Sequence, residues 1–129
     1  MPRLVLIVED SETCAETLLI ALESLPGIET RAIPNLRTAI ATIREKADEV
    51  AALVTDLHLG NGGSVYSDGF DLIRQLRAEP RFANLPILLI SGDSDPRLPD
   101  RAIALGANAF FPKPYSPAAV RKKLEQLLC

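Results

Sequence analysis

The most constraining feature of this sequence is an alternation between short apolar runs and longer segments whose apolar residues recur at helical spacing. Runs such as Leu4–Val8 and Pro86–Ile90 contain no polar side chain. A strand that is apolar on both faces belongs inside a parallel sheet that helices cover on each side. The strand candidates are Leu4–Val8, Ile28–Ile33, Ala51–Thr55, Pro86–Ile90 and Ala109–Phe111.

The segments between these strands carry apolar stripes with the period of an amphipathic helix. The stripes are Cys14, Leu18, Ala21, Leu22 and Leu25; Leu36, Ile40, Ile43 and Ala47; Phe70, Ile73 and Leu76; and Val120, Leu124, Leu127 and Leu128. Polar caps and breakers predict the boundaries. Helices are expected to start after Ser11, after Asn35 and near Ser116-Pro117, and to stop at Pro26-Gly27 and before Pro80.

A fourth helix is expected to be short, because Pro96 and Pro99 restrict where it can begin. We expect it to run from roughly Pro99 to Leu105 and to close at Gly106. The count is then five strand–helix units. This pattern predicts an α/β fold with a doubly wound, five-stranded parallel sheet and helices on both faces. With 129 residues, the chain is expected to form one domain over residues 1–129.

Composition argues against several classes of function. Fourteen Lys and Arg against seventeen Asp and Glu leave a net charge of −3, so no basic excess is available to neutralise a nucleic acid. Aromatic residues make up only 5% and Trp is absent, which disfavours a stacking platform for bases. Apolar runs such as Leu4–Val8 are far shorter than the roughly 20 residues that span a bilayer. The first residues also lack the pattern of a signal peptide, so we expect a cytoplasmic protein without a membrane partner.

Acidic residues stand where two of the predicted strands end. Glu9 and Asp10 follow the first strand, and Asp56 ends the third. Ligands in open parallel sheets bind beyond the carboxyl ends of the strands, where these carboxylates would converge. Two carboxylates about 4 Å apart repel by about 4 kcal/mol at an effective dielectric constant of 20, which favours a bound cation. Mg²⁺ fits better than Ca²⁺ because no EF-hand loop is present; alternatively, the acids only cap the following helices.

A hydroxyl and an ammonium are expected at the same edge. Ser91 follows the fourth strand and Lys113 follows the fifth. A phosphoryl group on a carboxylate needs this set of partners, with a metal and an ammonium to neutralise its oxygens and a hydroxyl to donate to one of them. Singly, Ser91 is explained as a loop cap and Lys113 as a solvated charge. Their joint placement at strand ends favours phosphoryl chemistry.

With these residues in place, the whole chain resembles the receiver domain of bacterial two-component response regulators. The matching stretches are Val-Leu-Ile-Val-Glu-Asp at 5–10, Leu-Val-Thr-Asp-Leu at 53–57, Ile-Leu-Leu-Ile-Ser-Gly at 87–92, Ala-Leu-Gly-Ala at 104–107 and Lys-Pro-Tyr at 113–115. The resemblance implies a flavodoxin-like sheet with strand order 2-1-3-4-5. It also implies a signalling domain that catalyses only its own phosphorylation and dephosphorylation.

The resemblance assigns roles to the acidic residues. Asp56 matches the aspartate that accepts a phosphoryl group from a histidine kinase or phosphotransfer protein. Asp10 and Asp56 would bind Mg²⁺ directly and Glu9 through water, while the backbone carbonyl of His58 would supply a further ligand. The side chain of His58 is then not a ligand.

The remaining motif residues match the catalytic and switch positions of receivers. Ser91 and Lys113 take the places of the hydroxyl residue and the lysine, and Lys113-Pro114 matches a peptide bond that is usually cis. Phe110 stands where many receivers carry an aromatic residue that turns inward when the hydroxyl residue moves. An output protein of unknown identity would then read the face formed by the fourth helix, fifth strand and fifth helix.

The stretch Leu57–Ser67, between Asp56 and the Asp68-Gly69 pair, is longer than is typical of receivers. It is polar and contains Gly60, Gly62 and Gly63, which favours a mobile flap beside the site. A glycine-rich phosphate loop is the competing interpretation, but the stretch lacks Gly-Lys-Ser/Thr.

Two other classes of function stay open at this point. One is a pseudo-receiver that binds partners without phosphorylation; the presence of all five polar positions argues against it. The other is a small Mg²⁺-dependent phosphatase of the haloacid dehalogenase type with Asp56 as nucleophile. That class has a second aspartate two residues later, where this chain has His58. No output module is expected after the last helix, so the output would pass through protein contact or through a larger protein of which the chain is a piece.

Overall fold

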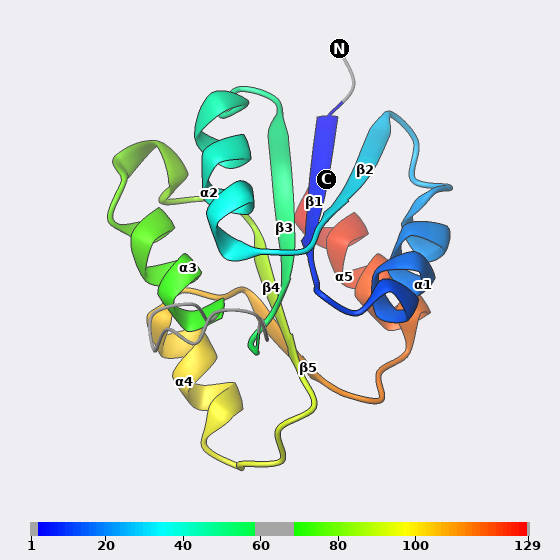
Figure 1. The fold of residues 1–129 in the computed structure, drawn as a ribbon, viewed down its shortest axis with the longest axis vertical. Helices are drawn as coiled ribbons and strands as arrows, with labels where there is room; N and C mark the ends of the chain where they lie inside the picture. Colours follow the sequence, from blue (N-terminus) through cyan, green and yellow to red (C-terminus); the bar gives the residue numbers. More distant parts are fainter. Residues whose placement is uncertain (1–2, 59–68, 129) are drawn as a thin grey trace.

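The apolar runs form one parallel sheet in the computed structural model, which describes residues 3–58 and 69–128 (Figure 1). The strand order is β2-β1-β3-β4-β5, which confirms the expected doubly wound topology. The strands are β1 Arg3–Val8, β2 Ile28–Ile33, β3 Val50–Asp56, β4 Ile87–Ser91 and β5 Ala109–Pro112. Most of the predicted insertion Leu57–Ser67 lies outside the described residues.

Helices cover both faces of the sheet (Figure 1). They are α1 Glu12–Leu22, α2 Leu36–Glu45, α3 Gly69–Arg77, α4 Leu98–Leu105 and α5 Pro117–Leu128, with a short 3₁₀ helix at Pro80–Phe82. Side chains alternate between two cores because successive residues of a strand point to opposite faces. One core lies under α2, α3 and α4, and includes Leu6, Leu53, Leu89, Ile43, Ile73 and Ala102. The other lies under α1 and α5, and includes Ile7, Val54, Ile90, Leu18, Val120 and Leu124.

Strand β3 lies between β1 and β4, and all seven of its residues are buried. Its register places Thr55 opposite Val8 and Asp56 opposite Ile90. At the next pair of strands, Ser91 lies opposite Pro112. Because every strand runs in the same direction, the residues at their carboxyl ends form one row along a single edge of the sheet. The fold therefore brings the predicted polar residues to one place.

Helix α1 ends three residues earlier than its apolar stripe predicts, because the stripe includes Leu25 but the helix ends at Leu22. Pro26 disfavours the helical conformation for the residue before it, so Leu25 reaches the core from a turn instead. The predicted N-caps are confirmed: Ser11 Oγ accepts from the Cys14 amide at 3.4 Å, and Asn35 Oδ1 accepts from the Thr38 amide at 2.8 Å.

Helix α4 begins at Leu98, one residue before the predicted start, and ends at a left-handed Gly106 as expected. The Lys113-Pro114 peptide bond is cis, in agreement with the resemblance. Among the helices that the structure describes, none combines the length and the apolar character needed to cross a bilayer.

Candidate functional site

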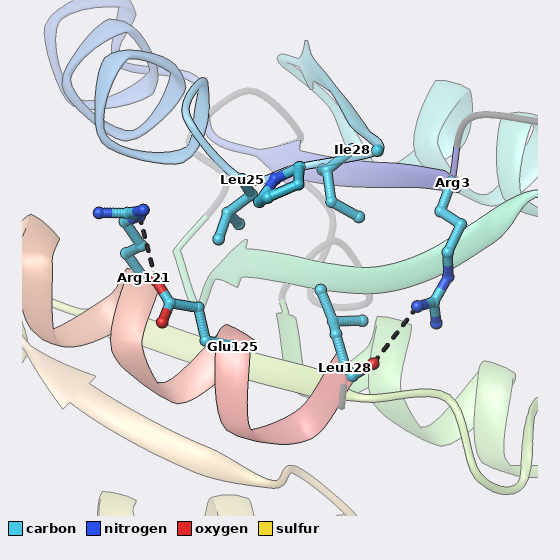
Figure 2. Close-up of a pocket in the computed structure, with 8 residues that line it drawn as sticks. Arg3, Leu25, Ile28, Arg121, Glu125 and Leu128 are labelled. Carbon is cyan, nitrogen blue, oxygen red and sulfur yellow. Dashed lines mark hydrogen bonds and ion pairs between the residues drawn. The ribbon is translucent and has the colours of Figure 1, made fainter.

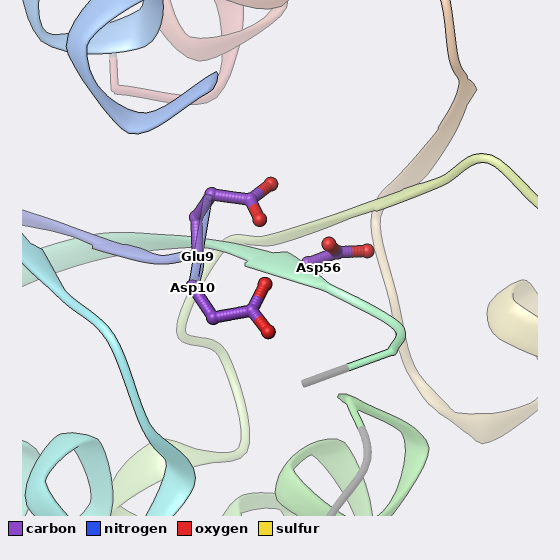
Figure 3. Close-up of side chains that lie close together, drawn as sticks. All are labelled: Glu9, Asp10 and Asp56. Atoms are coloured by element: carbon purple, nitrogen blue, oxygen red, sulfur yellow. The ribbon is translucent and has the colours of Figure 1, made fainter. Parts of the chain in front are cut away.

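Three carboxylates converge at the carboxyl edge of the sheet (Figure 3). Glu9 and Asp10 follow β1 directly, and Asp56 is the last residue of β3. One carboxylate oxygen from each residue lies within 4.8 Å of the others. The structure therefore brings together the three acidic residues that the sequence places at strand ends.

Burial makes this cluster electrostatically costly. Glu9 and Asp56 are only 3% and 5% exposed, whereas Asp10 is exposed. Burial raises the pKa of the Glu9 carboxyl from 4.5 to about 7, and the charge of Asp56 adds to this increase. The Ser11 amide donates to Glu9 Oε1 at 3.1 Å and acts in the opposite direction. A cation at this position would relieve the repulsion.

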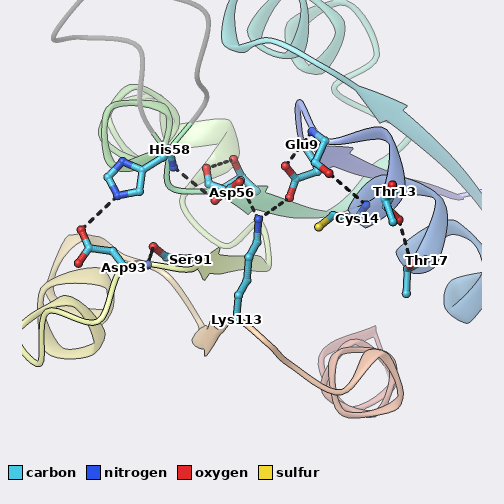
Figure 4. Close-up of polar contacts among 11 residues, drawn as sticks. Glu9, Thr13, Cys14, Thr17, Asp56, His58, Ser91, Asp93 and Lys113 are labelled. Carbon is cyan, nitrogen blue, oxygen red and sulfur yellow. Dashed lines mark hydrogen bonds and ion pairs between the residues drawn. The ribbon is translucent and has the colours of Figure 1, made fainter.

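Lys113 supplies one such cation (Figure 4). Its Nζ lies 3.0 Å from Glu9 Oε2 and 3.0 Å from Asp56 Oδ2. Burial acts to lower the pKa of Lys113, but hydrogen bonds to Asp56 and Glu9 outweigh it and raise this pKa above its ordinary value. The Lys113 amide also donates to the Ser91 carbonyl at 2.7 Å, which ties the ends of β4 and β5 together beside the cluster.

A second group of contacts lies on the other side of Asp56 (Figure 4). The His58 amide donates to Asp56 Oδ1 at 3.3 Å, and His58 Nε2 lies 3.3 Å from Asp93 Oδ2. The Asp93 amide donates to Ser91 Oγ at 3.0 Å. Asp56, His58, Asp93 and Ser91 thus form a continuous chain of contacts around the edge of the sheet.

The two predicted switch residues lie on the same face of the sheet. Ser91 is fully buried, and it follows Leu89 by two residues on β4, so both side chains point toward α2, α3 and α4. Phe110 lies opposite Leu89 in the register and packs, partly buried, against the same core. A movement of Ser91 can therefore reach Phe110 through the core on this face.

Two residues that support Asp56 were not assigned a role from the sequence. The Gly69 amide donates to the Leu57 carbonyl at 2.8 Å, and a Cβ at Gly69 would lie 2.5 Å from the Asp56 carbonyl oxygen. Thr55 Oγ1 donates to that same oxygen at 3.0 Å. A glycine as the first residue of a helix is the signal that could have indicated this close approach.

A hollow of about 610 Å³ lies at the opposite edge of the sheet (Figure 2). Its lining includes Arg3 and Ile28, the first residues of β1 and β2. Among the described residues that line it, Glu125 carries a carboxylate, which pairs with Arg121 at 3.2 Å. The hollow therefore shares no residue with the acidic cluster, and the polar chemistry is concentrated at the carboxyl edge.

The donor set of the cluster fits a hard divalent cation. Glu9, Asp10 and Asp56 offer carboxylate oxygens, which Mg²⁺ prefers, and exposed Asp10 leaves one side open to water. Burial and the charge of Asp56 raise the pKa of Glu9, and a bound cation would act in the opposite direction.

Comparisons with known proteins agree with this arrangement. The chain matches the response regulator receiver domain family over residues 5–125. It is 27% identical to the chemotaxis protein CheY1 of Helicobacter pylori strain J99 over 123 residues, which cover 95% of this chain and 94% of that protein. A CheY homolog of Campylobacter jejuni strain 81-176 is 26% identical over 83 residues, which cover 64% of this chain and 60% of that protein.

A solved structure gives the same result. The signal receiver domain of a signal transduction histidine kinase from Syntrophus aciditrophicus is 30% identical, with a TM-score of 0.81 over 98% of this chain and 89% of that chain. Fold, site geometry and family match thus lead to one assignment. The chain belongs to the response regulator receiver domain family, a signalling family whose general role is that of a phosphorylation switch in two-component and chemotaxis systems.

Proposed function

We propose that residues 1–129 form one receiver unit in which Asp56 accepts a phosphoryl group from a histidine kinase or a phosphotransfer protein. One observation carries this proposal: Asp56 ends the central strand with Lys113 Nζ 3.0 Å from its Oδ2. Glu9 and Asp10 complete an acidic cluster around it. Asp56 therefore lies beside both a cation and a possible metal site, at the end of the central strand.

The other two carboxylates are poorer phosphoacceptors. Burial raises the pKa of Glu9 to about 7, which favours its protonated form near neutral pH, and a protonated carboxyl is a poor nucleophile. Asp10 is exposed, whereas Asp56 is buried at the end of the central strand. In the transfer, an Asp56 oxygen bonds to phosphorus while the bond from phosphorus to the donor nitrogen breaks, and its electron pair stays with the donor imidazole.

Receiver domains generally bind Mg²⁺ at an acidic pocket, and this cluster would hold it. We assign Asp10 and Asp56 as direct ligands, Glu9 as a ligand through water, and the backbone carbonyl of His58 as a further ligand. When bound, Mg²⁺ supplies positive charge for the phosphoryl oxygens. Lys113 supplies a second positive charge next to Asp56 Oδ2.

The conformational switch uses Ser91 and Phe110. Once Asp56 carries a phosphoryl group, the Ser91 hydroxyl donates to one of its oxygens and moves toward it. This movement leaves space on the face under α4, into which Phe110 turns. The surface formed by α4, β5 and α5 changes shape as a result, and an output protein reads it.

Labelling with acetyl phosphate tests the phosphoacceptor. Incubation with Mg²⁺ is expected to add one phosphoryl group that hydroxylamine removes, as it does from an acyl phosphate. Asp56→Asn abolishes the label, whereas Asp48→Asn, which changes an exposed carboxylate on a turn, keeps it. A label that persists in Asp56→Asn would overturn the assignment. Absence of any label in the wild type would favour a pseudo-receiver, and multiple turnover of an aryl phosphate would favour a phosphatase.

A further inference from the structure

The two ends of α4 are held in different ways. At its C-terminal end, the Arg77 guanidinium reaches across from the last residue of α3, which lies beside α4 (Figure 1). Arg77 Nε and Nη2 donate to the Gly106 carbonyl at 3.1 and 2.7 Å, and Nη1 donates to the Phe82 carbonyl at 2.6 Å. Nη2 also lies 3.3 Å from Asn108 Oδ1. One half-buried side chain thus joins α3, the 3₁₀ helix and the turn after α4.

Gly106 is shaped for this contact. Its φ of +116° lies in the left-handed region, and its amide closes the helix by donating to the Ile103 carbonyl at 3.0 Å. A Cβ at this position would lie 2.9 Å from Arg77 Cγ, so a larger residue would displace the guanidinium. The Asn108 amide donates to the Ile87 carbonyl at 2.7 Å, and Asn108 Oδ1 accepts from the Ile87 amide at 2.9 Å. The turn after α4 is therefore fastened to the sheet as well as to α3.

Among the described residues, no side chain from another element bonds to the N-terminal end of α4 as Arg77 does to its C-terminal end, although the buried Leu98 packs there against the core. Its N-cap residue, Arg97, makes no side-chain capping bond, and Pro99 in the first turn has no amide hydrogen. Three serial hydrogen bonds lead to this end from the site. Asp93 N donates to Ser91 Oγ at 3.0 Å, Asp95 N to Asp93 Oδ1 at 3.0 Å, and Arg97 N to Asp95 Oδ1 at 2.9 Å. This loop connects the Ser91 hydroxyl to the first turn of α4 through local contacts.

One further contact lies between these ends. The Arg101 guanidinium stacks over the Phe70 ring at 4.8 Å and joins the middle of α4 to the start of α3. A stacked guanidinium can slide over a ring face, whereas Arg77 is held by directional bonds to three acceptors. The two arginines therefore restrain α4 unequally, and the stronger restraint is at Gly106.

We propose that Arg77 is a positioning residue that makes Gly106 a fixed pivot, so that a displacement of Ser91 turns the N-terminal half of α4 about its anchored C-terminal end. This inference rests on the proposed function, because Ser91 moves only if Asp56 is phosphorylated. It predicts that the output surface changes most near Leu98–Arg101 and least at Gly106–Asn108. In a hinge motion, a few residues at the end of an element absorb the change in backbone angles while the rest of the element turns.

Amide hydrogen exchange with beryllofluoride and Mg²⁺, used as the phosphoryl probe, tests the pivot. In the wild type, the probe changes exchange at Arg101 and Ala102 and leaves Gly106, Ala107 and Asn108 within about twofold of the free protein. In Arg77→Met, exchange at Gly106–Asn108 rises at least about tenfold, because the charge-assisted bonds are lost. The response to the probe then spreads along all of α4. Arg77→Lys replaces the guanidinium, which donates from three nitrogens, with a single ammonium. Exchange at Gly106–Asn108 is therefore expected to rise less than in Arg77→Met.

Arg74→Met is the matched control, since Arg74 is an exposed arginine one turn earlier on α3. It is expected to behave like the wild type. Probe affinity in Arg77→Met is expected to stay within about threefold of the wild type, which separates loss of the pivot from loss of the fold. If Arg77→Met binds the probe and shows the wild-type exchange pattern, the pivot is wrong. If the wild type fails to bind the probe, the phosphorylation site itself is wrong, and the pivot falls with it.

Discussion

Lys113 Nζ lies 3.0 Å from Asp56 Oδ2, although 57 positions separate the two residues in the sequence. The same nitrogen lies 3.0 Å from Glu9 Oε2, so one ammonium is shared between two buried carboxylates. A cation that binds among Glu9, Asp10 and Asp56 competes with Lys113 for the same negative charge. Metal binding would therefore release Lys113 to follow an oxygen of a phosphoryl group on Asp56.

Replacement of Lys113 is expected to separate metal binding from phosphorylation. Lys113→Met removes the competing ammonium, so Mg²⁺ binds several-fold more tightly. Labelling by acetyl phosphate slows at least about tenfold, because a positive charge aimed at the transferred group is lost. Calorimetric Mg²⁺ titration and the labelling rate measure the two effects. Lys122→Met, an exposed lysine of α5, serves as the control; weaker Mg²⁺ binding in Lys113→Met than in this control would contradict the competition.

The raised pKa of Glu9 predicts how stability depends on pH. The folded-state pKa of about 7 lies above the ordinary value of 4.5, so between these values the folded protein binds more protons than the unfolded chain. The free energy of unfolding of the metal-free protein therefore falls as pH rises from 4.5 to 7, by at most on the order of 3 kcal/mol. Titration of Lys113 changes the free energy of unfolding only above its ordinary pKa of 10.5, which lies outside this pH window.

Denaturant unfolding in EDTA at a series of pH values measures this effect. Glu9→Gln should remove the decline between pH 4.5 and 7 that the raised pKa predicts, while Glu16→Gln on the exposed face of α1 should keep it. Added Mg²⁺ restores stability toward pH 7, since it binds the folded state alone. An unchanged pH profile in Glu9→Gln would show that Glu9 is not the titrating group.

The convergence of the site could be predicted from the sequence because it follows from topology. Strands that are apolar on both faces require a parallel sheet, and a parallel sheet places all carboxyl ends at one edge. Glu9, Asp56, Ser91 and Lys113 each stand at or next to such an end, so their approach needs no knowledge of individual side-chain conformations. The periodic pattern of the chain therefore predicts both the fold and the site.

Contacts that depend on turns and loops could not be predicted in this way. Arg77 resembles an ordinary solvated charge at the end of a helix until the turn after α4 brings the Gly106 carbonyl to it. Leu25 fits the apolar stripe of the first helix, but Pro26 moves it into a turn. The pairing of His58 with Asp93 joins two loops, and no periodicity relates their positions.

Asp10 is expected to contribute to Mg²⁺ affinity more than to the fold. It is the exposed member of the acidic cluster, so Asp10→Asn removes a ligand charge without exposing the core. Mg²⁺ affinity should fall at least about tenfold, since carboxylate oxygens dominate binding of this hard cation. Calorimetric titration measures the change, with Asp48→Asn as the control for a lost surface charge. An unchanged affinity in Asp10→Asn would remove Asp10 from the site.

The contact between His58 and Asp93 is expected to control the lifetime of the phosphoryl group. His58 Nε2 lies 3.3 Å from Asp93 Oδ2, and the His58 amide donates to Asp56 Oδ1, so this pair lies beside the phosphoacceptor. His58→Ala or Asp93→Ala opens the approach for water, so dephosphorylation should accelerate by about threefold or more, with phosphorylation changed by less than about twofold. The double variant should dephosphorylate at nearly the rate of either single variant, because each single change already removes the contact between His58 and Asp93.

Decay and formation of the label, followed by mass spectrometry, give the two rates. Asp100→Ala, an exposed carboxylate on α4, controls for the loss of negative charge near the site. Equal changes in both rates, or no change in either, would exclude this role for His58 and Asp93.

Ser91 is expected to transmit phosphorylation to Phe110 without being needed for the transfer itself. Ser91→Ala removes the hydroxyl that would donate to the phosphoryl group, while Lys113 and the acidic cluster stay in place. The chain contains no Trp, so Phe110→Trp introduces a single Trp at the switch position, and its emission can be excited selectively over that of the two Tyr residues. In that background, beryllofluoride with Mg²⁺ should change the emission, and the added Ser91→Ala should reduce this change by about threefold or more while acetyl phosphate labelling persists.

Ser91→Thr, which keeps the hydroxyl, is the control and should retain the emission change. An equal emission change with and without the Ser91 hydroxyl would show that Phe110 responds through another route.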